Sequence, residues 1–200
     1  MKQEEIWNAI AGKWDSFRTR PVDEVVDFLP KQKGAVLDLG CGSGRNFIKN
    51  EGVRLYGVDF SSELLKLAEK HASELGIDAE LKVSGADNIP YDDEFFDAAI
   101  FVRALHCVDS EEKRKKSLQE LFRVLKSGSE AVVSVWSRGQ DRVKNKDKVC
   151  YMPWTVGDKT YERYTYIYDK DEFENLLKSV GFEIVSLEEG KNIVAVVRKK

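Results

Sequence analysis

Residues 36–44, Val36-Leu37-Asp38-Leu39-Gly40-Cys41-Gly42-Ser43-Gly44, decide the fold of this chain. An apolar strand that contains an acidic residue opens here into a turn with glycine at every second position. Because glycine has no Cβ and tolerates positive φ angles, such a turn lets the backbone approach a ligand closely. The stretch therefore predicts a nucleotide-type cofactor site at the end of a buried strand.

The spacing of these glycines separates two cofactor classes. A dinucleotide fingerprint, G-x-G-x-x-G, has its third glycine three residues after the second. Arg45 stands at that place here, and the third glycine, Gly44, comes one residue early. The carboxylate of Asp38 would repel a pyrophosphate, whereas it could hold the ammonium of an amino-acid-bearing cofactor. The turn resembles motif I of the class I S-adenosylmethionine (SAM) methyltransferases, which implies SAM as the cofactor.

Three later segments follow in the order of that family. Asp59 ends the apolar run 54–58, about 20 residues after the turn, where its carboxylate can accept hydrogen bonds from two ribose hydroxyls. Residues 85–91 resemble the loop that reads the adenine edge, and residues 95–101 resemble the fourth strand. The alternative is a turn without a ligand, beside incidental acids. The predicted cofactor-binding residues are Asp38, Gly40, Cys41, Gly42, Gly44, Asp59, Phe60, Ala86, Asp87 and Arg103.

Length and composition fit a single domain over residues 1–200. Of the 200 residues 42% are hydrophobic, which is enough for a substantial core. The net charge of −3 argues against indiscriminate binding of nucleic acid. We see no targeting segment and no apolar run of membrane length, and the three cysteines lack C-x-x-C spacing. We therefore expect a cytoplasmic protein with no membrane association and no metal site.

Apolar periodicity predicts an α/β fold. An N-terminal helical segment, residues 1–30, precedes alternating strands and helices, and a final strand pair, 182–188 and 192–198, forms a hairpin. This alternation indicates a doubly wound, mostly parallel, Rossmann-like sheet with helices on both faces. The family resemblance implies seven strands in the order 3-2-1-4-5-7-6. The pattern also predicts a short helix after the glycine turn, through Phe47 and Ile48.

The segment 137–168 is the main indication of the substrate. It is too long for an ordinary connection, and an insertion at the carboxyl ends of the strands borders the active crevice. It is basic from Arg138 to Lys148 and aromatic from there to Tyr168. Charge followed by aromatic rings suits phosphate contact and base stacking in single-stranded RNA. The alternatives are a solvated basic face and, for the last three tyrosines (Tyr164, Tyr166 and Tyr168), an edge strand of the sheet.

A closer resemblance covers nearly the whole chain. It is to the tRNA methyltransferases that esterify 5-carboxymethyl groups on the wobble uridine, and it implies tRNA and a small zinc-binding activator subunit as partners. Cys107 stands where family members commonly have a second histidine. The similar segments are residues 6–21, Ala104-Leu105-His106-Cys107, Trp136, Pro153-Trp154 and residues 162–168. The predicted substrate-binding residues are Arg20, Trp136, Arg138, Arg142 and Trp154.

The predicted catalytic residues are His106 and Arg163. Methylation of a carboxylate needs positioning rather than a base, because the sulfonium of SAM already activates the methyl group. Arg163 could hold the carboxylate bidentately, and His106 could hydrogen-bond it or the uracil edge. With a hydroxyl or amine acceptor, His106 would instead be a base with a pKa near ~6.5. The alternatives are a surface ion pair of Arg163 with Glu162 or Asp169 and, for His106, a satisfied histidine in a βα turn.

Two other functions stay open on the sequence. A small-molecule methyltransferase of the ubiquinone/menaquinone type would share the patterns at residues 85–91 and 95–98. A SAM-binding scaffold without catalysis, whose apolar surface docks a partner, is the third possibility.

Overall fold

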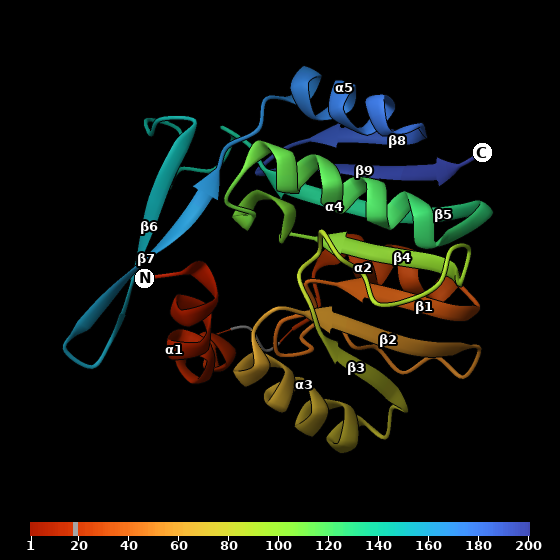
Figure 1. Cartoon of the computed structure of the whole chain (residues 1–200), viewed down its shortest axis with the longest axis horizontal. Helices are drawn as coiled ribbons and strands as arrows, with labels where there is room; N and C mark the ends of the chain where they lie inside the picture. The colour runs from red at the N-terminus through yellow and green to blue at the C-terminus, as the bar shows by residue number, and fades with distance from the viewer. Residues whose placement is uncertain (18–19) are drawn as a thin grey trace.

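The computed structural model describes residues 1–17 and 20–200. Its main element is a seven-stranded sheet in the order β3-β2-β1-β4-β5-β9-β8 (Figure 1). β9 runs antiparallel to both β5 and β8, and the other pairs are parallel. The strands are β1 (Gly34–Leu39), β2 (Val53–Asp59), β3 (Ala79–Val83), β4 (Phe96–Val102), β5 (Leu125–Trp136), β8 (Phe182–Glu189) and β9 (Asn192–Lys199). Because β8 and β9 are the sixth and seventh strands of this sheet, the predicted order and the mostly parallel α/β class are confirmed.

Helices cover both faces of the sheet. They are α1 (Gln3–Ser16), α2 (Asp23–Phe28), α3 (Ser62–Leu75), α4 (Glu111–Val124) and α5 (Lys170–Val180), and a 3-10 turn, Leu29–Lys31, follows α2. Apolar residues of α4 and α5 share one core cluster with Leu37 and Phe101. Those of α2 pack against Val36 and Ile100, which point to the opposite face. In the described residues, no helix is long and apolar enough to cross a membrane.

Short polar residues and glycines fix the helix ends. The hydroxyl of Ser61 accepts a hydrogen bond from the backbone N–H of Leu64 at the start of α3, and Ser110 does the same at the start of α4. Gly76 ends α3 with a φ of 64°, a conformation that costs glycine little.

The predicted short helix after the glycine turn is wrong. Turns occupy residues 42–46, and the described chain has no helix between β1 and β2. Gly40, Gly42 and Gly44 all have positive φ, which a right-handed helix does not allow. A Cβ on Gly44 would lie only 2.8 Å from the ring of Phe47. Phe47 itself packs into the core cluster of α3. The apolar residue at position 47 therefore reflects packing of its ring in the core and not the periodicity of a helix.

The insertion 137–168 folds into a separate hairpin. Its strands are β6 (Val149–Val156) and β7 (Lys159–Tyr166), which pair only with each other within the described sheets. The alternative that Tyr164 and Tyr166 form an edge strand of the main sheet is therefore wrong. The hairpin stands beyond the end of the sheet where β1, β2 and β4 finish (Figure 1).

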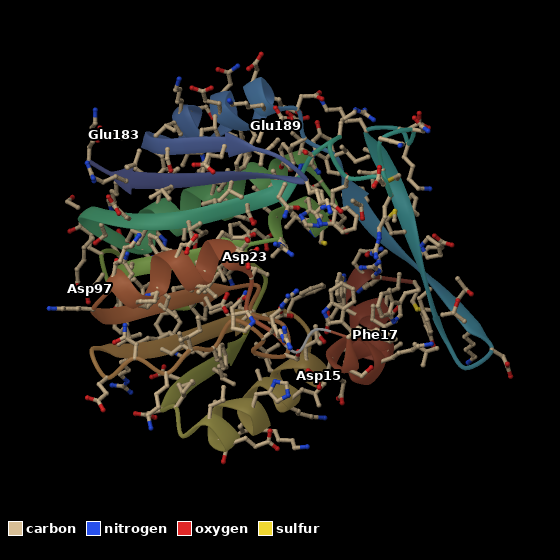
Figure 2. All side chains as sticks on the ribbon, turned by 180° about the vertical axis from the view of Figure 1, so that it is seen from behind. Asp15, Phe17, Asp23, Asp97, Glu183 and Glu189 are labelled. Atoms are coloured by element: carbon tan, nitrogen blue, oxygen red, sulfur yellow. The ribbon has the colours of Figure 1, made fainter. Side chains whose placement is uncertain are left out.

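Helix α1 lies between α3 and the hairpin (Figure 1). On one side Asn8 accepts a hydrogen bond from the Ser61 hydroxyl, at 2.7 Å, and Asp15 approaches His71 of α3 at 3.6 Å. On the other side the side chain of Lys13 donates to the carbonyl of Thr155 on β6. Seen from behind, Phe17 at the end of α1 lies beside the hairpin (Figure 2), and its ring contacts Trp154 at 5.9 Å between centroids.

Candidate active site

A cavity of about 620 Å³ lies at the carboxyl ends of β1, β2 and β4. Eight of the ten predicted cofactor-binding residues line it: Gly40, Cys41, Gly42, Asp59, Phe60, Ala86, Asp87 and Arg103. The other two, Asp38 and Gly44, lie behind this wall. Helix α1 supplies the opposite side of the cavity through Gln3, Trp7 and Trp14.

Backbone hydrogen bonds hold the glycine turn against β2. The N–H groups of Gly40 and Cys41 donate to the carbonyl of Val58, at 2.7 and 3.2 Å. A Cβ on Gly40 would lie 2.6 Å from the Cβ of Ala104, so packing requires glycine there. A Cβ on Gly42 would meet no atom of the described residues within 4 Å, although φ is 57°. Gly42 therefore leaves open space on the cavity side, which suits close approach of a ligand.

The carboxylate of Asp59 lies at the edge of this turn. Oδ2 accepts from the N–H of Gly42 and Oδ1 from the N–H of Ser61, each at 2.9 Å. Burial raises the pKa of Asp59 to about 6, and the backbone N–H groups oppose that rise. Each carboxylate oxygen can accept a further hydrogen bond. The arrangement fits an acceptor for two ribose hydroxyls.

Asp38 lies under the turn rather than on the cavity wall. It is 1% exposed, and its Oδ2 has no hydrogen-bond partner among the described residues. Burial, and then the charge of Asp59, raise the pKa of Asp38 to about 8, while Arg45 lowers it. A cationic ligand in the cavity would compensate the buried carboxylate. The donor and acceptor set of this cavity therefore fits SAM, which carries an ammonium, a sulfonium and a ribose.

A second cavity, of about 310 Å³, adjoins the first. Its wall carries five cationic side chains and three tryptophans: Arg45, Arg103, Arg142, Arg163, Lys191, Trp7, Trp14 and Trp136. Asp141 is the one acid among the described lining residues, and it pairs with Lys144 at 3.3 Å. The residues common to both walls are Trp7, Trp14, Arg45, Arg103 and Cys107. The second cavity is thus suited to a planar, anionic group that reaches toward the first.

His106 is a neutral group in the second cavity. It is 2% exposed, and its ring stacks on Trp136 with centroids 4.9 Å apart. Burial, reinforced by the charges of Arg163 and Arg103, lowers its pKa to about 3. This value is well below the pKa near 6.5 that His106 would need as a base. Nδ1 is buried without a hydrogen-bond partner in the described residues.

Arg163 is buried among tryptophans. Its guanidinium carbon lies 4.8 Å from the ring of Trp14, 5.1 Å from Trp154 and 5.5 Å from Trp7. With 6% of the residue exposed, the alternative of a surface ion pair does not hold. Gln3 clamps β7 on both sides of this residue, because its amide accepts from the N–H of Tyr164 and donates to the carbonyl of Glu162.

Comparison with known proteins agrees with this geometry. Residues 36–128 match a family model described as a methyltransferase domain. The chain belongs to the SAM-dependent methyltransferases. It is 34% identical, over 68% of its length, to a tRNA (carboxymethyluridine(34)-5-O)-methyltransferase of Arabidopsis thaliana, of which it spans 33%. It is 26% identical to the Schizosaccharomyces pombe protein of that name, with 90% of this chain and 88% of that protein covered.

Solved structures share the fold. One is a methyltransferase of Haloferax volcanii in complex with the Trm112 methyltransferase activator. It superimposes with a TM-score of 0.71 at 15% identity, over 96% of each chain. The chain spans about a third of the Arabidopsis relative and 22% of a Xenopus tropicalis one, so those relatives extend well beyond the methyltransferase fold seen here.

The structure gathers only part of the predicted substrate-binding set of this methyltransferase. Trp136 and Arg142 line the second cavity, and Trp154 contacts Arg163. The carbonyl of Arg20 accepts two hydrogen bonds from the Arg45 guanidinium, at 3.1 and 2.8 Å. Arg138 lies outside the described cavity wall and donates to the carbonyl of Lys146.

Sequence reasoning missed the residues that hold this methyltransferase's site together. Gln3, Glu24, Ser134 and Lys191 belong to no motif, and their partners or cavity neighbours are distant in sequence. Glu24 was recognisable only as an acid near the start of a helix, and Gln3 only as a polar residue of an amphipathic one.

Proposed function

We propose that this methyltransferase transfers the methyl group of SAM to the carboxylate of 5-carboxymethyluridine at the tRNA wobble position. The observation that carries the proposal is the second cavity, in which cationic and aromatic side chains surround a neutral histidine. A planar base with an attached carboxylate matches both the tryptophan rings and the positive charge. The names of the Arabidopsis and Schizosaccharomyces relatives favour the same acceptor.

The expected chemistry needs no proton transfer to the protein. SAM supplies an activated methyl group, so that a C–O bond to the carboxylate forms as the C–S bond breaks and its electron pair stays on sulfur. The chain's own contribution is to bind, orient and desolvate the acceptor. His106, with a pKa of about 3, is uncharged near neutral pH and is poorly suited to take up a proton. We assign it to hydrogen bonding of the acceptor from the wall of the second cavity.

Arg163 and the aromatic side chains are proposed to bind the acceptor nucleotide. Three tryptophan rings hold the guanidinium of Arg163 in the wall of the second cavity, which limits its rotamers before the acceptor arrives. Arg142 and Lys191, on the same wall, place positive charge where a nucleotide phosphate can reach. A small activator subunit is part of the proposal, because the related fold from Haloferax volcanii was solved with such a partner.

Transfer of a labelled methyl group tests this function. Purified protein, alone and with a Trm112-type activator, would be given tritiated SAM and tRNA that carries 5-carboxymethyluridine. We expect label in tRNA that mild alkali releases, since a methyl ester hydrolyses and a methyl on nitrogen or carbon does not. The matched control is the same tRNA with the neutral amide, 5-carbamoylmethyluridine, which should take up no label.

Two outcomes would contradict the proposal. Alkali-stable label in a small-molecule extract, with none in tRNA, would favour a methyltransferase of the ubiquinone/menaquinone type. SAM binding without turnover on tRNA, extract or protein, with the activator present, would favour the non-catalytic scaffold.

A further inference from the structure

Arg103 stands where the two cavities meet. It lines both of them, whereas Arg163 and His106 line only the second. A methyl group that passes from one cavity to the other must cross this junction, so the nucleophilic atom of the acceptor has to lie there. Among the cationic residues of the walls, only Arg103 and Arg45 belong to the junction within the described residues.

The backbone of Arg103 is held in an uncommon conformation. Its φ is 55°, and only one other described residue besides the glycines, Glu94, has a positive φ. Side chains with a Cβ rarely adopt this region, and when they do so beside a cavity the surroundings must enforce it. Here the N–H of Arg103 donates to the carbonyl and to the hydroxyl of Ser134 on β5, at 2.9 and 3.2 Å.

A closed network fixes the side chain as well. The carboxylate of Glu24, on α2, accepts from Nε and Nη2 of Arg103, both at 3.1 Å. The same carboxylate accepts from the Ser134 hydroxyl at 3.0 Å. Ser134 is fully buried and the side chain of Glu24 nearly so, while the side chain of Arg103 is about one third exposed. In the described residues these bonds use Nε and Nη2, which leaves the two N–H groups of Nη1 for a ligand.

We infer that Arg103 is the residue that binds the carboxylate of the acceptor, and that Glu24 and Ser134 are positioning residues which aim it. This inference rests on the proposed function and deepens it. The sequence had suggested Arg163 as the residue that binds the acceptor carboxylate, and we now place that carboxylate at the junction. Arg103, predicted to bind the cofactor, is instead assigned to the acceptor. Arg163 then binds the remainder of the acceptor, deeper in the second cavity.

Selectivity for acid over amide tests the inference directly. Protein saturated with S-adenosylhomocysteine, the product form of the cofactor, would be titrated with two anticodon stem-loop RNAs. One carries 5-carboxymethyluridine and the other its neutral amide, and tryptophan fluorescence reports binding because Trp7, Trp14 and Trp136 line the cavity. We expect the wild type to prefer the acid and Arg103→Gln to lose at least about tenfold of that preference, as for one charge-assisted hydrogen bond.

Arg163→Gln is the matched control. It also removes one positive charge from the second cavity. It should lower the affinity for both RNAs by the same factor, so that the preference for the acid persists. Glu24→Gln keeps Arg103 but removes the charge of its clamp, and it should lower the preference by a smaller factor. This variant also carries the test if Arg103→Gln does not fold, as judged by far-UV circular dichroism. SAM affinity by calorimetry should be unchanged within about twofold in Arg103→Gln.

Several results would overturn the inference. They are a wild type that does not discriminate acid from amide, an Arg103→Gln or Glu24→Gln variant that discriminates as the wild type does, and a tenfold loss of SAM affinity in Arg103→Gln. Failure of the proposed function looks different. Suppose that Arg103 carries the preference for the acid, yet labelled SAM yields no alkali-labile ester on that RNA. The assignment of Arg103 is then supported, and the proposed methylation of the carboxylate is contradicted.

Discussion

The first and the second cavity are built in different ways. The inner wall of the first comes from short contiguous segments after β1, β2, β3 and β4, where backbone N–H groups hold the carboxylate of Asp59. The wall of the second combines residues that follow β1 and β4 with others from α1, β5, β7, the loop between β5 and β6 and the turn between β8 and β9, and five of its polar groups are long cationic side chains. Substitutions in the first cavity change the path of the backbone, so few should be tolerated. In the second cavity a substitution can remove one polar side chain and leave the others in place.

Gly42→Val should abolish measurable SAM binding, because the new side chain enters the open space beside the glycine turn. We expect a loss of affinity of at least about 100-fold by calorimetry, or about 2.7 kcal/mol. Gly157→Val is the matched control, since Gly157 has a φ of 56° against 57° for Gly42 and also faces open space, but lies at the tip of the hairpin. Equal loss of SAM binding in both variants would mean that backbone strain, and not occupation of the cavity, is the cause.

Asp59→Ala should weaken SAM binding by at least about tenfold, because hydrogen bonds to a charged acceptor contribute roughly 1.5–3 kcal/mol. Asp97→Ala is the control. Asp97 also accepts a backbone N–H, that of Ala35 at 2.8 Å, but it lies at the opposite end of the sheet from the hairpin (Figure 2). Calorimetry that finds unchanged SAM affinity in Asp59→Ala would remove the ribose assignment.

SAM affinity should rise with pH up to about pH 8. In the free protein burial raises the pKa of Asp38 to about 8, so below that pH the carboxyl is largely protonated. A bound cation favours the ionised form and therefore expels the proton, which costs affinity of up to about tenfold for each pH unit below the pKa. Calorimetry in buffers of different ionisation enthalpy would report the released proton. Asp38→Asn should release fewer protons, because only Asp59, with a pKa of about 6, is then left to lose one. A pH-independent affinity in the wild type would contradict the coupling.

With SAM saturating at every pH, the single-turnover rate of methyl transfer should be nearly flat from pH ~6.5 to ~8.5. A carboxylate acceptor titrates near pH ~4, and His106, with its pKa lowered to about 3, does not titrate in this range either. His106→Gln should keep part of the activity, because glutamine can still form a hydrogen bond. A base would be worth about 10²–10⁴-fold, so a nearly inactive His106→Gln variant would return His106 to general-base catalysis.

Neutralising the basic loop should have the smallest effect. Replacing Arg138, Arg142, Lys144 and Lys148 together should lower tRNA affinity and leave SAM affinity unchanged. The slope of log affinity against log salt concentration should decrease by about the amount expected for one phosphate contact. The change is small because Lys144 already pairs with Asp141, and Lys148 with Asp169 and Glu172. Replacing Lys126 and Arg198, which pair with Asp97, Glu130 and Glu183, is the control. Identical salt slopes for both variants and the wild type would assign the loop to a solvated face.

The same contrast explains what the sequence could predict. Glycine spacing and the acid after the second strand pointed to residues that line the first cavity, because those residues lie within a few positions of a motif. The strand order needed the family resemblance, since periodicity does not record which strands are neighbours. Glu24 escaped prediction because its partners Arg103 and Ser134 are 79 and 110 residues away, and Gln3 because it clamps β7 from 161 residues away.

Helix α1 contributes Trp7 and Trp14 to both cavities, and this shared wall has a thermodynamic consequence. A ligand in either cavity that holds α1 in place prepares the wall of the other, so donor and acceptor should bind with positive cooperativity. The coupling is reciprocal, and whatever factor SAM adds to the affinity for the acceptor, the acceptor must add to the affinity for SAM. Release of the products should be coupled in the same way, with departure of the first loosening the hold on the second.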